Sequence, residues 1–147
     1  MKLQRSGWLV VALLVVGACK LNAQTSYPLP SSLCNESRGD IWCSQINNVV
    51  IGGDTYDIYI FAPAQDANGN FTNGSITFRK FLPSYWQDTV ESLSGTVTGS
   101  SKTTQEFTGT FSGSYTGSIS FRIVFHSVCS RYCHVYWIED EGTVTLQ

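Results

Sequence analysis

The clearest pattern in this chain is an alternation of apolar and polar residues that runs from Phe107 to Phe125. Its odd-numbered positions carry phenylalanine, tyrosine, isoleucine or glycine, and its even-numbered positions up to Ser120 carry serine or threonine. A period of two residues is typical of β-strands that bury one face and expose the other. Glycines also separate the large buried residues, as in small barrels and strongly curved sheets. The stretch therefore predicts an all-β fold.

This alternating stretch is too long for one ordinary strand. Its nineteen residues would extend over roughly 60 Å at about 3.3 Å per residue, so the chain must turn or bend within it. A three-residue loop around Ser112–Gly113 or Thr116–Gly117 would keep the same residues on the buried face. One long strand bent at a glycine bulge is the alternative, and the pattern does not separate the two.

A second predicted hairpin surrounds Gly52–Gly53, because glycine pairs are typical of two-residue hairpin turns. If Ile51 lies opposite Asp54, one buried face carries five residues: Val49, Ile51, Tyr56, Ile58 and Ile60. Alternation along the second strand places Asp54 and Asp57 on opposite faces, which argues against an acid–base pair.

The remaining strands are predicted over residues 75–81, 90–97, 104–111, 121–128, 133–139 and 143–146. We expect loops over Ala62–Gly74 and Pro83–Asp88, a turn at Glu139–Gly142, and an irregular, disulfide-pinned segment over residues 24–48. About eight short strands predict a single antiparallel β-barrel, with a two-sheet β-sandwich as the alternative.

The first residues are typical of an export signal. Lys2 and Arg5 precede an apolar run that is too short to span a bilayer, so residues 1–23 are predicted to be a signal peptide. Residues 16–19 resemble the bacterial lipobox, which predicts that Cys19 is lipidated and becomes the new N-terminus. Cleavage after Ala23 and plain secretion is the alternative. Residues 24–147 then form one β-domain.

Four further cysteines indicate disulfides, because an even number in an exported chain is typical of an oxidising compartment. Three connectivities are possible, and the simplest pairs Cys34 with Cys43 and Cys129 with Cys133. Neither spacing is that of a zinc ribbon, and no cofactor is expected.

The charge of the domain limits its partners. Residues 24–147 contain eleven acidic and six basic residues, which gives a net charge of −5. This balance argues against nucleic acid and against electrostatic attachment to a membrane, so we expect membrane contact only through the N-terminal lipid.

His126 and His134 are the best candidates for chemistry. In a hairpin that pairs Cys129 with Cys133, they would be diagonal neighbours on the exposed face, at roughly 7 Å between Cβ atoms. They could bind a metal or act as a general base, but no third ligand accompanies them. We therefore expect no catalytic residues and no metal, with an envelope hydrolase that uses both histidines as the alternative.

Exposed aromatic residues indicate binding instead. Tyr85 and Trp86 lie in a predicted connection and, together with Ala62–Gly74, are expected to form the binding surface. Arg38–Gly39–Asp40 matches the integrin-binding tripeptide, but so short a match arises easily by chance, and a polar loop is the preferred interpretation. The sequence thus predicts a non-enzymatic, lipid-anchored domain that binds a protein, glycan or small ligand at the cell envelope. A purely structural surface protein is a further alternative.

Overall fold

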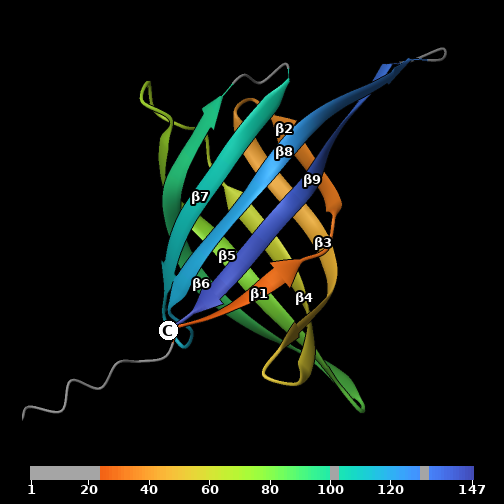
Figure 1. The fold of residues 1–147 in the computed structure, drawn as a ribbon, viewed down its shortest axis with the longest axis vertical. Coiled ribbons are helices and arrows are strands. Elements are labelled where there is room, and N and C mark those ends of the chain that lie inside the picture. The colour runs from red at the N-terminus through yellow and green to blue at the C-terminus, as the bar shows by residue number, and fades with distance from the viewer. Residues whose placement is uncertain (1–23, 100–102, 130–132) are drawn as a thin grey trace, which may run out of the picture.

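The computed structural model describes residues 24–99, 103–129 and 133–147, without the side chains of Ser44, Gln45 and residues 126–141. The predicted signal peptide and Cys19 lie outside the described residues. All regular elements in the described part are β-strands, numbered as in Figure 1: β1 (Thr25–Leu29), β2 (Ser32–Ser37), β3 (Asp40–Ile51), β4 (Asp54–Ala62), β5 (Asn70–Leu82), β6 (Tyr85–Gly99), β7 (Thr104–Ser112), β8 (Gly117–Cys129) and β9 (Cys133–Leu146).

The strands form one antiparallel sheet. From β2 to β9 each strand pairs with the next one along the chain, and β9 also pairs with β1 and β2 on its other side. The predicted all-β, antiparallel fold is therefore confirmed. The choice between a closed barrel and a sandwich stays a prediction.

The prediction of an irregular segment over residues 24–48 is wrong, because this segment forms β1, β2 and most of β3. Its alternation was hidden by irregular pairing. The register between β3 and β4 shifts twice, between Cys43 and Ile46 and between Ile46 and Val49. Each shift moves the buried residues out of period two, so they no longer read as a strand.

The disulfide prediction is confirmed for Cys34 and Cys43, which face each other across β2 and β3 and are both buried. The backbones of Cys129 and Cys133 also pair directly at the end of the β8–β9 hairpin, as predicted. Their side chains lie outside the description, so this second disulfide stays a prediction.

The hairpin around Gly52–Gly53 has the predicted register, with Ile51 opposite Asp54 and Val49 opposite Tyr56. Both glycines have positive φ angles, 60° and 92°, which a two-residue turn of this kind requires. The five residues assigned to one face are all buried.

The stretch from Phe107 to Phe125 contains a turn, so a single bent strand is wrong. The loop is longer than the three residues expected, because the last pair before it joins Phe111 to Gly117. This spacing still keeps the odd-numbered residues on the inner face. There Phe107 stacks on Phe121 with ring centroids 4.3 Å apart. A side chain on Gly117 would collide with the carbonyl oxygen of Thr145, which explains the glycine at this position.

Three predicted boundaries are corrected. The loop before β5 covers only residues 63–69, because the carboxylate of Asp66 accepts the N–H groups of Asn68 and Asn70 and starts β5 there. Tyr85 and Trp86 belong to β6, and only Pro83 and Ser84 connect the strands. Residues 139–142 are part of a continuous β9, where a register shift against β8 takes up the extra residues.

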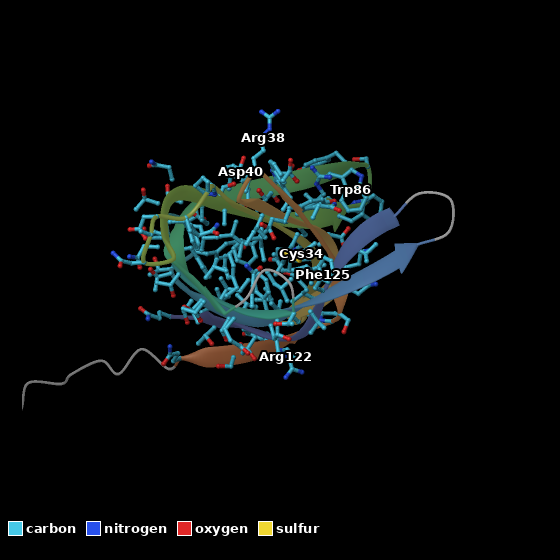
Figure 2. The ribbon with its side chains drawn as sticks, turned by 90° about the horizontal axis from the view of Figure 1, so that it is seen from above. Cys34, Arg38, Asp40, Trp86, Arg122 and Phe125 are labelled. Carbon is cyan, nitrogen blue, oxygen red and sulfur yellow. A yellow bond between two sulfur atoms is a disulfide. The ribbon has the colours of Figure 1, made fainter. Side chains whose placement is uncertain are left out.

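The inner face of the sheet surrounds a core of apolar side chains, which Figure 2 shows filling the space inside the curved strands. Phe78 lies near the middle of this core and contacts Tyr56, Phe111 and Tyr115 at ring-centroid distances of 5.0–6.4 Å. The described side chains of the core therefore pack against one another across the inside of the sheet.

Candidate functional site

Two hairpin turns lie at the same end of the molecule, the β3–β4 turn and the β5–β6 turn (Figure 1). A cleft of about 440 Å³ opens between them on the outer surface. Its lining combines aromatic, charged and amide side chains: Asn48, Gly53, Asp54, Thr55, Asp57, Arg79, Lys80, Phe81 and Trp86. We call it the hairpin cleft.

The aromatic wall of the hairpin cleft comes from a hairpin that extends beyond its neighbours. The pairing of β5 with β4 ends at Lys80, and the pairing of β6 with β7 begins at Ser92. Phe81 and Trp86 lie opposite each other in this projecting part, with ring centroids 4.7 Å apart. They are 60% and 54% exposed, so their apolar faces are available to a ligand.

Arg79 lies beside this wall and is held on two sides. Its guanidinium donates two hydrogen bonds to Asp88, at 2.6 and 2.7 Å, and one to the hydroxyl of Tyr59 at 3.2 Å. It also lies over the rings of Tyr59 and Trp86. The bonds from Arg79 hold the pKa of Asp88 below its ordinary value, because they favour the charged carboxylate. The paired hydrogen bonds therefore hold the guanidinium of Arg79 beside the ring of Trp86.

A second ion pair bridges the two hairpins. Lys80 on β5 donates to the carboxylate of Asp54 at 2.6 Å, directly after the β3–β4 turn. Asp57 lies beyond it and accepts the backbone N–H of Asn48 at 3.3 Å. Asp54 and Asp57 both line the hairpin cleft, although strand alternation alone assigned them to opposite faces. The cleft thus holds fixed hydrogen-bonding groups next to an apolar wall.

The predicted location of the binding surface is only partly correct. Tyr85 and Trp86 are exposed, but Ala62–Gly74 does not join them. The two segments lie at opposite ends of β5, whose thirteen residues span roughly 40 Å at about 3.3 Å per residue. Residues 63–66 and 70–73 instead line a separate groove of their own. The role of Tyr85 and Trp86 in binding stays a prediction.

A larger groove of about 560 Å³ crosses the outer face of β6, β7 and β8. Seven of its twelve lining residues are serine or threonine, and some of their hydroxyls bond to each other, as between Thr96 and Thr108 at 2.8 Å. Charged side chains and exposed aromatic rings do not contribute to it. The smaller hairpin cleft is therefore the better candidate, because specific sites combine apolar surface with a few fixed polar groups.

The histidines remain unassigned. His126 pairs with Tyr136 and His134 with Val128 along the backbone, as predicted, but their side chains lie outside the description. Among the side chains that are described, no group of three histidine, cysteine or acidic residues could hold a metal ion. No helix in the described ranges is long and apolar enough to cross a membrane.

The tripeptide Arg38–Gly39–Asp40 forms the β2–β3 turn. Arg38 and Gly39 have positive φ angles, and Arg38 points away from the body of the protein (Figure 2). The carboxylate of Asp40 accepts the N–H of Ala64 at 2.7 Å, and Gln65 donates to the carbonyl of Gly39 at 2.9 Å. Asp40 therefore holds the β4–β5 loop against the turn, which is a structural role.

Glu91 is a buried acidic residue that the sequence interpretation missed. It is 3% exposed, and its carboxylate accepts the N–H groups of Ser114 at 3.1 Å and Tyr115 at 2.8 Å. These bonds fasten the β7–β8 loop over one end of the core, where the Tyr115 hydroxyl lies 3.3 Å from that of Tyr56. Burial, and then this contact, raise the pKa of Tyr56. The signal was present, because Glu91 alternates with the buried Leu93 and Val97.

Comparison with protein-family models, curated proteins and solved structures found no match for this chain. The class that the structure defines is an all-β antiparallel domain with a buried disulfide. Such a disulfide is typical of an oxidising, extracytoplasmic environment.

Proposed function

We propose that this protein is an exported, lipid-anchored and non-enzymatic binding protein of the cell envelope, and that the hairpin cleft binds a carbohydrate. The single observation that carries the proposal is the exposed Phe81–Trp86 wall beside fixed carboxylate, guanidinium and ammonium groups. A sugar ring has apolar C–H faces and a rim of hydroxyls. Aromatic side chains pack on such faces, and charged or amide groups bond to such rims.

The dimensions of the cleft support a ligand of one or two sugar rings. Its volume of about 440 Å³ falls within the range of about 300–1,000 Å³ that is usual for small-molecule sites. The Arg79–Asp88 and Lys80–Asp54 pairs already hold their side chains in place. A ligand would therefore lose less free energy in ordering them.

Closure of the sheet into a barrel is part of the proposal. Closure is supported by the strand pairings. β9 pairs with β8 on one side and with β1 and β2 on the other, and β2 pairs with β3, so the pairings lead around the sheet from β2 to β9 and back to β2. In a closed barrel the cleft lies on an outer wall that is rigid on both sides. A rigid scaffold holds the hairpins in fixed positions.

The test is a screen of oligosaccharides against the mature protein, followed by titration calorimetry with the best ligand. Replacing Trp86 by alanine should weaken binding about tenfold, which corresponds to about 1.4 kcal/mol. Its melting temperature should stay within about 2 °C of that of the unmodified protein, because the ring is more than half exposed. Val90→Ala is the matched control, since Val90 is exposed on the same face but does not line the cleft. A Trp86→Ala variant that unfolds would assign Trp86 to the core and would contradict the proposed site.

A further inference from the structure

The β5–β6 hairpin ends in a short apolar tip, which we define as residues 82–85. Tyr85 is 59% exposed, Pro83 is exposed and Leu82 is half-buried. No charged residue occurs between Phe81 and Trp86. In the described part of the sheet, residues 81–91 pair only within the hairpin, so the tip projects from the body (Figure 1).

The tip lies at the same end of the molecule as the start of the domain. Thr25 pairs with Leu146, and Leu146 pairs with Gly117, where β8 begins. β7 ends at this level, with Ser112 opposite Ser92 of β6. From the level of Ser92 the β5–β6 hairpin continues toward its tip, which lies beyond the end of the molecule at which β1 begins (Figure 1).

A lipid on Cys19 would bring this end close to a membrane. Cys19 precedes Thr25 by six residues, and an extended chain covers at most about 3.3–3.6 Å per residue. The start of β1 therefore stays within roughly 20 Å of the lipidated residue. The β2–β3 turn, at the opposite end, faces away from the bilayer.

From these positions we propose that the hairpin tip inserts into the interface of the bilayer that holds the lipid anchor. The inference rests on the anchor in the proposed function. Tyrosine and tryptophan are enriched at membrane interfaces because one part of the ring is apolar and another can bond to water or headgroups. The tip supplies apolar surface there, while Phe81 and Trp86 behind it stay at the level of the headgroups. The hairpin cleft would then open at the membrane surface.

The charges near the tip indicate that apolar burial drives this contact. Arg79 is paired with Asp88 and Lys80 with Asp54, so both nearby cations are neutralised by protein carboxylates. The domain carries a net charge of −5. Insertion should therefore not need anionic lipid, and on uncharged vesicles it should not weaken as the ionic strength rises.

The test uses the mature, lipidated protein in phosphatidylcholine vesicles that contain brominated lipid. Trp86 fluorescence, obtained by difference from a Trp86→Phe variant, should be quenched in part, because the ring lies at the level of the headgroups and next to the brominated chains. The Trp86→Phe variant, which keeps Trp42 near the β2–β3 turn and Trp137 on β9, should show no quenching. The double variant Leu82→Ser with Tyr85→Ser should reduce the quenching at least twofold. Leu33→Ser is the control, because Leu33 is an aliphatic residue that is 52% exposed on β2 and lies away from the tip.

A second measurement separates this inference from the anchor. The mature chain with Cys19→Ser should still sediment with vesicles, at least tenfold more than its double tip variant and equally in 0.1 and 0.5 M salt. Unquenched Trp86 together with absent sedimentation would overturn the tip contact and leave the anchor standing. Sedimentation that salt abolishes would also overturn it. Loss of sugar binding in the tip variant without any vesicle effect would assign the tip to the sugar site instead.

Discussion

Substitution of Glu91 by glutamine tests whether a buried carboxylate holds the β7–β8 loop in place. The glutamine keeps the size of the side chain and one carbonyl oxygen for the N–H of Tyr115. Its amide group would face the N–H of Ser114, so the bond measured at 3.1 Å is lost. Substitution by alanine removes both bonds and leaves a void beside Gly113, which the carboxylate now touches.

The expected magnitude follows from the number of bonds. A hydrogen bond to a charged group contributes about 1.5–3 kcal/mol to stability, and burial of a carboxylate offsets part of this gain. We therefore expect the free energy of unfolding to fall by about 1.5 kcal/mol for Glu91→Gln and by about 3 kcal/mol or more for Glu91→Ala. For a domain of this size the melting temperature would fall by about 6 °C and about 12 °C respectively.

Urea unfolding followed by fluorescence measures these differences, and limited proteolysis reports on the loop itself. Glu106→Gln is the control, because Glu106 lies exposed on the outer face of β7 and its loss of charge should change stability by less than about 0.5 kcal/mol. A Glu91→Gln variant as stable as the unmodified protein would refute the reasoning. The charge of Glu91 would then make no net contribution to stability.

Three further predictions concern acid stability, sheet closure and processing. Backbone hydrogen bonds from Asn70 and Asn68 lower the pKa of Asp66. The contribution of the Asp66 carboxylate to stability is therefore present above about pH 4 and is lost as the pH falls through the lowered pKa. An Asp66→Asn variant should lose less stability than the unmodified protein between about pH 4 and 2. If the sheet is closed, amides of β9 residues that face β2 should exchange with deuterium as slowly as those that face β8, and fast exchange on one side would indicate an open edge. The intact mass of the mature protein should correspond to a chain that begins at a lipidated Cys19, and a mass that begins at unmodified Gln24 would exclude the anchor.

Local patterns were sufficient for the central strands. The turn at Gly52–Gly53 predicted a register that the structure reproduces, and the alternation from Phe107 to Phe125 predicted which residues are buried, because period two and turn geometry depend only on neighbouring residues. The same reasoning failed for residues 24–48. Two register shifts in β3 interrupt the alternation there, and their positions depend on pairing with β4.

The exposure of Tyr85 and Trp86 was predicted, but for the wrong reason. Consecutive aromatic residues after Pro83 indicated a connection, whereas they belong to β6 and are exposed because the hairpin extends beyond β4 and β7. Strand lengths relative to one another are a property of the whole sheet. The sequence alone therefore placed the residues at the surface without identifying the surface.

By itself the sequence determined the strand class and the register at the Gly52–Gly53 turn, and it gave Cys34 with Cys43 as the simplest disulfide pairing, because each follows from contacts between residues close together in the chain. Only the tertiary structure decided the hairpin cleft and the role of Glu91. The cleft joins residues 48–57 to residues 79–86, and Glu91 bonds to a loop more than twenty residues away. Such contacts arise when separate hairpins are brought side by side, and no local pattern records which hairpins will meet.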